Sequence, residues 1–209
     1  MNQFAAVAGA HFLALLSPGP DFLLIAHSSM ATGWRRAAAA CAGIATANAV
    51  FIVAAFAGLS ILRPGTLAFT VVQIAGAGFL VYLGIRFLRS AGSTSIESAP
   101  PGVVPVRTAA RWWKLAVTGF ASAALNPKNA LFYASLAAVL VAGTSAGHLA
   151  AYGMWMVAVV LGWDLLIAVL IGNRVVLTRF ARALPLLERA SGIALIPLGV
   201  GILLVAVMR

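Results

Sequence analysis

The chain has 209 residues, of which 63% are hydrophobic and only 18 are charged, namely 14 Lys or Arg and 4 Asp or Glu. An ordinary soluble domain carries charge on about a quarter of its residues, and a disordered chain is poor in apolar residues. Both classes are excluded, which leaves an all-α polytopic membrane protein with a single membrane domain over residues 1–209. The net charge of +10 would suggest a nucleic-acid partner in a soluble protein, so the positions of the cations decide its meaning.

Six apolar runs are long enough to cross a membrane, because about 20 helical residues span a hydrocarbon core of about 30 Å. They are residues 4–26, 37–62, 67–87, 115–142, 149–172 and 184–207. The longest connection, residues 90–111, is rich in Gly, Ser and Pro and is predicted to be a cytoplasmic linker. It separates two halves of three spans each, residues 1–89 and 112–209. Because three is odd, the second half must cross in the opposite sense, which predicts two inverted three-helix repeats.

The cations indicate an orientation, because cytoplasmic loops of membrane proteins collect Lys and Arg. Only Arg63 and Arg209 fall on one side of the predicted spans, and Lys128 lies within the fourth span. The other eleven cations follow spans one, three and five: Arg35, Arg36, Arg86, Arg89, Arg107, Arg111, Lys114, Arg174, Arg179, Arg182 and Arg189. We therefore expect three basic loops in the cytoplasm, both termini outside and no nucleic-acid partner.

The second apolar run carries small residues spaced by four, among them Ala39, Gly43 and Ala47. This spacing lets the backbone of another helix approach closely, so it predicts a tight helix–helix contact. The only cysteine of the chain, Cys41, lies in the same run. One thiol cannot form an intrachain disulfide, and a buried apolar role is predicted for it.

Two spans are interrupted by proline at corresponding positions. The first contains Ser17-Pro18-Gly19-Pro20-Asp21. Proline has no N–H, so the carbonyls one turn earlier lose their partners, and in hydrocarbon they must be satisfied by protein or by a water-lined cavity.

The fourth span contains Asn126-Pro127-Lys128 at a similar depth in the second half. Paired broken helices in inverted halves are typical of secondary transporters, whose site lies near the middle of the membrane. A purely structural kink remains the alternative for either break.

Three ionisable residues are predicted inside spans, Asp21, Lys128 and Asp164. Charges in a membrane are costly and usually face a pathway or a partner. Asp21 is the first candidate to carry a proton, Asp164 the second, and Lys128 is the candidate to contact a carboxylate; the alternative for each is a static charge pair. Asn48 in the second span is a polar neighbour. Counting about 1.5 Å per residue puts Asp21 and Asp164 near the cytoplasmic side and Lys128 near the outer side. No simple Asp21–Lys128 contact is therefore expected unless the broken helices re-enter the membrane.

A catalytic alternative rests on residues 143–147, which match the G-x-S-x-G string and precede His148. That motif requires a strand–turn–helix context, which the apolar pattern does not provide. An intramembrane serine protease centred on Ser145 is therefore the weaker hypothesis, and a small-residue turn is expected. The three histidines, His11, His27 and His148, show no metal-ligand spacing, so no metal or cofactor is predicted.

Three motifs taken together resemble the LysE/RhtB family of amino-acid exporters. They are the Ser-Pro-Gly-Pro-Asp of residues 17–21, residues 82–90 at the end of the third span, and the Leu-Asn-Pro-Lys-Asn-Ala-Leu-Phe of residues 125–132. The motifs occur in the order and at the spacing seen in that family, and the resemblance extends over nearly the whole chain. The resemblance implies export of an amino acid or derivative from the bacterial cytoplasm across the inner membrane, with protons as the coupling ion, and it implies that the two proline segments line the site.

The expected function is thus a secondary transporter that exports amino acids by proton antiport and alternating access. The expected pathway residues are Ser17, Pro18, Gly19, Pro20, Asp21, Asn48, Asn126, Pro127, Lys128 and Asp164. A passive channel or structural membrane subunit is the alternative. The lipid bilayer is the expected surrounding, and the identity of the amino acid and assembly into a homo-oligomer are left open.

Overall fold

The computed structural model contains helices and no strands over the residues it describes, which are 2–16, 19–60, 66–92, 111–140, 144–171 and 174–208. In chain order they are α1 (Asn2–Leu16), α2 (Pro20–Thr32), α3 (Trp34–Ser60), α4 (Leu67–Ser90), α5 (Trp112–Ala124), α6 (Pro127–Leu140), α7 (Ala146–Ile171) and α8 (Arg174–Val207). The predicted pathway residues Ser17 and Pro18 and nearly all of the predicted linker lie outside the described residues. So do the cations Arg63, Arg107 and Arg209.

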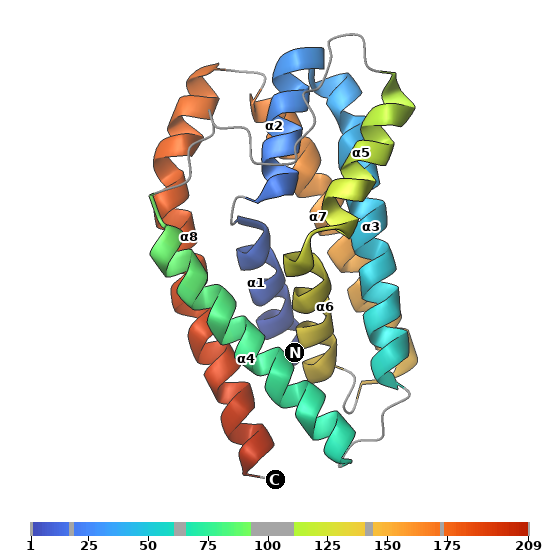
Figure 1. Ribbon diagram of the computed structural model, residues 1–209, viewed down its shortest axis with the longest axis vertical. Helices are drawn as coiled ribbons and strands as arrows, with labels where there is room; N and C mark the ends of the chain where they lie inside the picture. Colours follow the sequence, from blue (N-terminus) through green and yellow to red (C-terminus); the bar gives the residue numbers. More distant parts are fainter. Residues whose placement is uncertain are drawn as a thin grey trace.

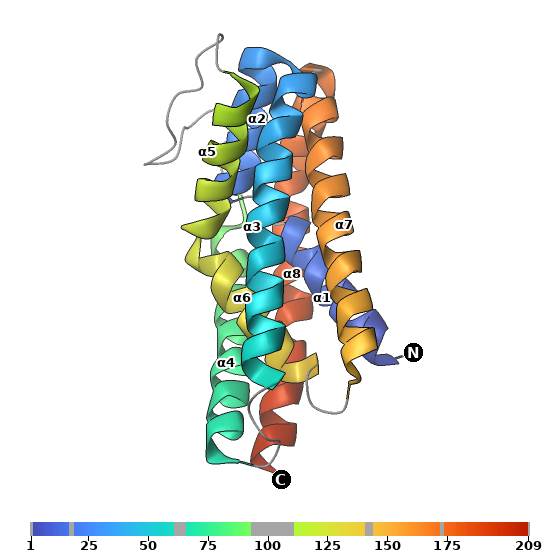
Figure 2. The same ribbon diagram turned by 90° about the vertical axis from the view of Figure 1, so that its right-hand side faces the viewer.

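The helices form an elongated bundle in which α3, α7 and α8 run along the long axis and α4 crosses it obliquely (Figures 1 and 2). Both termini lie in the lower half of the bundle (Figure 1). The beginnings of α3, α5 and α8 lie at the upper end (Figure 1), and the first three residues of α3 and of α5 include Arg35, Arg36 and Lys114. The bundle therefore has a basic end, and the termini point away from it.

Within the described residues, four helical segments are long and apolar enough to cross a membrane: Trp34–Leu59, Leu67–Ser90, Ala146–Ile171 and Arg182–Leu204. The predicted first span is found as α1 and α2, which differ in direction by 53° and count as a fifth span if taken together. The predicted fourth span is found as α5 and α6, of 13 and 14 residues, and each is about 20 Å long, too short to cross alone. Six spans in two inverted repeats thus stay a prediction.

Glycines allow two helix pairs to pack closely, α3 with α5 and α4 with α8. A Cβ atom on Gly43 of α3 would overlap the carbonyl oxygen of Ala116 on α5, and one on Gly119 would overlap that of Ala40. Between α4 and α8, a Cβ on Gly192 would lie 2.7 Å from the carbonyl oxygen of Gly84. The close approach predicted from the small residues of the second span is therefore made by α5. Cys41, on the same helix, is fully buried, as predicted.

The prediction of a loop between the fifth and sixth spans is wrong, because most of this basic segment is helical. α8 begins at Arg174, ten residues before the predicted start of the sixth span. Arg179, Arg182 and Arg189 therefore lie on a helix of 34 residues. These arginines stand among Val, Leu, Phe and Ala residues in the first half of α8, the same helix that contains the candidate span Arg182–Leu204. The charges lower the local hydropathy, so a search for apolar runs misses this segment.

Candidate functional site

The first helix break lies between Leu16 of α1 and Pro20 of α2. Pro20 is the first residue of α2, a position where the missing N–H costs nothing because that donor has no partner within the helix. Asp21 follows in the first turn of α2, where its carboxylate meets the positive end of the helix dipole. The sequence thus starts a new helix here and places an acid at its beginning.

The second break lies between Ala124 of α5 and Pro127 of α6. Asn126 caps α6, because its side-chain Oδ1 accepts a hydrogen bond of 3.1 Å from the backbone N–H of Lys128. The side chain of Asn129 reaches back and donates to the carbonyl of Ala123 at 3.4 Å. The residues of the motif therefore satisfy backbone groups on both sides of their own break.

Groups from the second half of the chain stabilise the end of α1. The Nζ of Lys128 donates a hydrogen bond of 3.2 Å to the carbonyl oxygen of Ala14. This carbonyl would accept from residue 18 in a continuous helix, but that residue is a proline and has no N–H. The Oγ of Ser191 on α8 donates to the carbonyl of Leu13 at 2.8 Å. A cation at a helix C-terminus also meets the negative end of the dipole.

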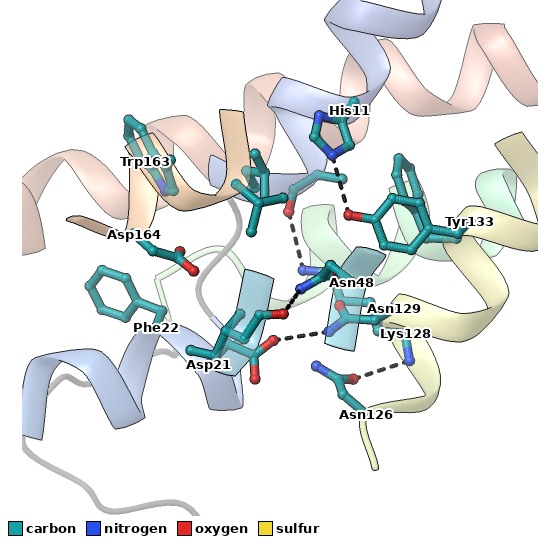
Figure 3. Close-up of a pocket in the computed structure, with 16 residues that line it drawn as sticks. His11, Asp21, Phe22, Asn48, Asn126, Lys128, Asn129, Tyr133, Trp163 and Asp164 are labelled. Carbon is teal, nitrogen blue, oxygen red and sulfur yellow. Dashed lines mark hydrogen bonds between the residues drawn. The ribbon is translucent and has the colours of Figure 1, made fainter. Parts of the chain in front are cut away.

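Asp21, in the first half of the chain, binds in turn to residues of the second half. One carboxylate oxygen accepts a hydrogen bond of 2.7 Å from Ser122 on α5, and the other accepts one of 2.9 Å from Asn129 on α6. Figure 3 shows Asp21 and Asn129 facing one another. The two proline breaks are therefore linked reciprocally, with Asp21 bound by α5 and α6 and Lys128 bound to α1.

A cavity of about 60 Å³ lies between the two breaks. Its polar lining residues come from α1, α2, α3, α7 and the start of α6: His11, Asp21, Asn48, Asn126, Lys128, Asn129, Tyr133, Trp163 and Asp164. Asp164 is only 7% exposed, and its Oδ2 has no hydrogen-bond partner among the described residues. Asn48 donates to the carbonyl of Ile44 in its own helix at 2.8 Å. We call this the small cavity.

A second cavity, of about 450 Å³, lies on the other side of the breaks. It lies among α2, α4, α6 and α8, and it shares Gly19, Asn126 and Lys128 with the small cavity. Its remaining lining residues are Pro20, Phe79, Tyr82, Leu83, Arg86, Phe87, Ser90, Pro127, Leu131 and Glu188. We call this the large cavity. All eight predicted pathway residues that the structure describes line one cavity or both.

The expected separation of Asp21 and Lys128 in depth is not found, because both line the small cavity (Figure 3). The expected depths of the two residues were counted along straight helices, starting from the opposite end of each span. The bend between α1 and α2 and the interruption before α6 change the course of both chains, so such a count overestimates the separation. Each charged residue directly follows its proline, and the breaks meet at one level.

Glu188, a third acid beside Asp21 and Asp164 in the described bundle, was not predicted; it lies on α8 and is only 1% exposed. It was overlooked because it stands next to Arg189 and near the other arginines at the predicted start of the sixth span. The sequence did contain one indication of its burial. Glu188 stands four residues after Leu184 in an apolar stretch, so in a helix the two side chains lie on the same face, and Leu184 is buried.

His11 and Tyr133 are further polar residues whose place in the site was not predicted. His11 is 1% exposed, and its Nε2 lies 3.3 Å from the hydroxyl of Tyr133. Its ring also lies among those of Phe132 and Trp155, at centroid distances of 6.2 and 5.7 Å. These contacts pack His11 among aromatic side chains, and its ring also forms part of the wall of the small cavity.

Ser145 and His148, the basis of the protease hypothesis, do form a hydrogen bond, with Oγ and Nδ1 2.7 Å apart. Both side chains are exposed at the start of α7, and the same hydroxyl accepts from the backbone N–H of His148 at 3.4 Å. The pair therefore caps a helix, and neither residue lines either of the two cavities. Among the described residues, no three His, Cys, Asp or Glu side chains are grouped so as to hold a metal ion.

Comparison with known proteins gives consistent matches. The family model for the "LysE type translocator" matches residues 12–206, a range that contains both helix breaks. The chain is 27% identical over 168 residues to the threonine efflux protein of Escherichia coli (strain K12), covering 79% of this chain and 80% of that protein. It is 31% identical over 137 residues to the leucine efflux protein of Salmonella typhi, covering 65% and 61%. No solved structure matches the chain.

Proposed function

Because this chain belongs to the LysE type translocator family, we propose that it exports an amino acid from the bacterial cytoplasm across the inner membrane, in exchange for protons. The relatives named as threonine and leucine efflux proteins support an amino acid as the substrate. The observation that carries the proposal is the meeting of the two broken helices, where Asp21, Lys128 and Asp164 line one cavity. Buried charges at broken helices are the usual means by which secondary transporters bind substrates and ions.

Six spans follow if each broken pair counts as one, α1 with α2 and α5 with α6. The two halves then have the same order of elements, a broken span followed by two long helices, and they are inserted in opposite directions. The reciprocal bonds of Asp21 and Lys128 support this arrangement, since each connects the break of one half to the other half. We further propose that the basic end of the bundle faces the cytoplasm and that both termini lie outside.

Unequal packing of the two halves supports alternating access. α4 packs on α6, and α1 packs on α8. An inverted repeat makes these pairs equivalent to α8 with α2 and to α4 with α5, which make little or no contact in the part of the chain that the structure describes. Because α1 and α6 lie in the half with the termini and α2 and α5 in the basic half, the bundle is more tightly closed on the outer side (Figure 1). We therefore assign it to a state that loads substrate from the cytoplasm.

The two acids of the small cavity differ in their contacts, and the difference favours Asp164 ahead of Asp21 as the proton carrier. Asp21 already accepts bonds from Ser122 and Asn129. A buried carboxylate oxygen without a hydrogen-bond donor, as in Asp164, is costly unless it binds a proton. A volume of about 60 Å³ holds a few water molecules, since one needs about 10–15 Å³, so the small cavity suits protons and water.

Lys128 lines both cavities, so the same residue is available to a substrate in the large cavity and to the proton-binding small cavity. A substrate carboxylate in the large cavity would draw on the positive charge of Lys128, which also lines the small cavity. An acid that loses a neighbouring cation holds its proton more tightly, so this contact alone would favour binding of substrate and proton together. Exchange requires that the two compete, as they do when the substrate's ammonium group and the proton bind the same carboxylate.

The test is transport by the purified protein in proteoliposomes with the membrane potential clamped. A gradient of one pH unit is worth about 1.4 kcal/mol, so one-for-one exchange supports up to about tenfold accumulation of an amino acid. Asp164→Asn is expected to abolish this accumulation and to retain exchange between labelled and unlabelled amino acid. Glu97→Gln makes the same kind of change in the predicted linker and serves as the control. Equilibration of amino acids without any pH-driven accumulation would refute antiport and favour the passive channel.

A further inference from the structure

The two cavities differ in size, and the difference separates their roles. Ligand sites in proteins are usually about 300–1,000 Å³, so the large cavity, at about 450 Å³, suits one small organic molecule. The small cavity, at about 60 Å³, is too small for an amino acid. If the chain transports amino acids as proposed above, the substrate must occupy the large cavity in the state seen here.

The large cavity carries opposite charges on different helices. Lys128 comes from α6, and Glu188, which is 1% exposed, comes from α8. The Nζ of Lys128 lies 5.1 Å from the centre of the Phe87 ring and bonds to the Ala14 carbonyl, so the ammonium group is held at the wall. An ammonium group has three donors, and the bond to Ala14 is therefore compatible with a bound carboxylate. A zwitterion needs both partners, because either of its charges is costly to bury alone.

The rest of the wall is largely apolar. Phe79, Leu83 and Phe87 line it from α4, and Leu131 lines it from α6. A hydroxyl or amide placed against these four side chains would lose its hydrogen bonds to water without replacement, whereas Tyr82, Ser90 and Asn126 supply polar groups elsewhere in the lining. A cationic side chain is opposed further, because Arg86 and Lys128 already place two positive charges in the lining. Apolar side chains, in contrast, gain by leaving water.

From these contacts we propose that the large cavity is the substrate site and that it selects neutral amino acids with apolar side chains. Glu188 binds the α-ammonium group, Lys128 binds the α-carboxylate, and the wall of α4 and α6 receives the side chain. The assignment rests on the proposed function and adds to it a residue, Glu188, and a substrate class.

Valine and threonine give the first test, because they have nearly the same shape and differ by a methyl in place of a hydroxyl. The measurement is competition by each unlabelled amino acid against exchange of labelled leucine in proteoliposomes. An apolar wall discriminates against an added hydroxyl by up to about a hundredfold. We expect valine to compete at least about tenfold better than threonine, and lysine to compete least.

Two leucine analogues test the charged residues separately. 4-Methylpentanoate lacks the ammonium group, and 3-methylbutylamine lacks the carboxylate. Glu188→Gln is expected to weaken leucine competition at least about tenfold and to leave that of 4-methylpentanoate unchanged. Lys128→Met is expected to weaken leucine and to leave 3-methylbutylamine unchanged. Binding of the unaffected analogue, followed as a thermal shift, shows that each variant is folded. Glu97→Gln and Lys114→Met are the matched controls.

The outcomes separate this proposal from the transport function itself. Threonine competing as well as valine, while exchange proceeds, would overturn the apolar substrate class and leave amino-acid export intact. Equal weakening of leucine and 4-methylpentanoate by Glu188→Gln would overturn the ammonium assignment. Absence of exchange with every amino acid would overturn both proposals.

Discussion

The hydrogen bond between Asp21 and Asn129 offers a sharp test of the link between the two halves. Asn129 donates to one carboxylate oxygen of Asp21 at 2.9 Å, and Ser122 donates to the other at 2.7 Å. In Asp21→Asn one of these oxygens becomes an NH₂ group. The Ser122 hydroxyl can rotate and accept from it, so the amide oxygen can still face Asn129. The geometry is kept, and the negative charge that strengthens both bonds is lost.

The size of the effect follows from the difference between charged and neutral hydrogen bonds. A bond to a charged group contributes about 1.5–3 kcal/mol, and a neutral one about 0.5–1.5 kcal/mol. Two such bonds therefore lose about 2 kcal/mol together. The loss of the favourable charge at the start of α2 adds about 0.5 kcal/mol. The free energy of unfolding of Asp21→Asn should fall by about 2–3 kcal/mol.

The reversed pair supplies the control. Asn129→Asp alone places two carboxylates side by side, which is unfavourable by mutual repulsion. The double variant with Asp21→Asn and Asn129→Asp restores one amide and one carboxylate with the charge on the other helix. It should recover at least about 1 kcal/mol relative to the sum of the single variants, more than the ~0.3–0.5 kcal/mol expected of independent sites.

The assay is unfolding of the purified protein in detergent, followed by tryptophan fluorescence, for the parent, both single variants and the double variant. If the single losses simply add, the side chains do not interact and the reciprocal link between the breaks is wrong. An unchanged stability of Asp21→Asn would refute the contribution of the charge.

Three further predictions concern packing, the end of α1 and orientation. Gly119→Val should lower the thermal stability, because a side chain there collides with the backbone of α3 and overpacking costs about 1–3 kcal/mol. Gly162→Val on α7 is the control and should be close to neutral, because a Cβ there meets nothing within 4 Å. Thermal unfolding in detergent measures both variants. Ser191→Ala should lower the stability by about 1 kcal/mol in the same assay, since it removes the donor to a carbonyl at the end of α1, and no change would refute that contact. In a cysteine-free background, a membrane-impermeant maleimide should label Ser145→Cys in intact cells and Gly92→Cys only in inverted vesicles; the opposite pattern would reverse the proposed orientation.

Local chemistry explains which parts of the fold were predictable. Both helix breaks were predicted, because proline removes a donor whatever surrounds it, and α2 and α6 each begin at the proline itself. The beginning of α8 was not, because its arginines lower the hydropathy of a segment that is nevertheless helical. Hydropathy reports how a segment partitions between water and lipid, and a helix can extend beyond the apolar stretch that hydropathy detects.

The depth of the charged residues shows the same limit. Asp21 and Lys128 each stand beside a helix break, where both are partly buried, and their roles remain proposals. Their meeting at one cavity was not predicted, because a sequence gives distances along a straight helix and does not give the bends. Glu188 was missed for a related reason, since neighbouring arginines suggested a solvent-facing position, whereas the packing of α8 buries it.

The sequence by itself determined the class of the protein, the family it belongs to, the location of both helix breaks and the carbonyls that those breaks leave without a local donor. These follow from composition and from the covalent structure of proline. Only the tertiary structure decided what satisfies them. The Ala14 carbonyl, whose local donor would be Pro18, accepts from Lys128, 114 residues away along the chain. Ser191, 178 residues after Leu13, donates to the neighbouring Leu13 carbonyl. Such pairings depend on how helices pack in three dimensions, and no local pattern encodes them.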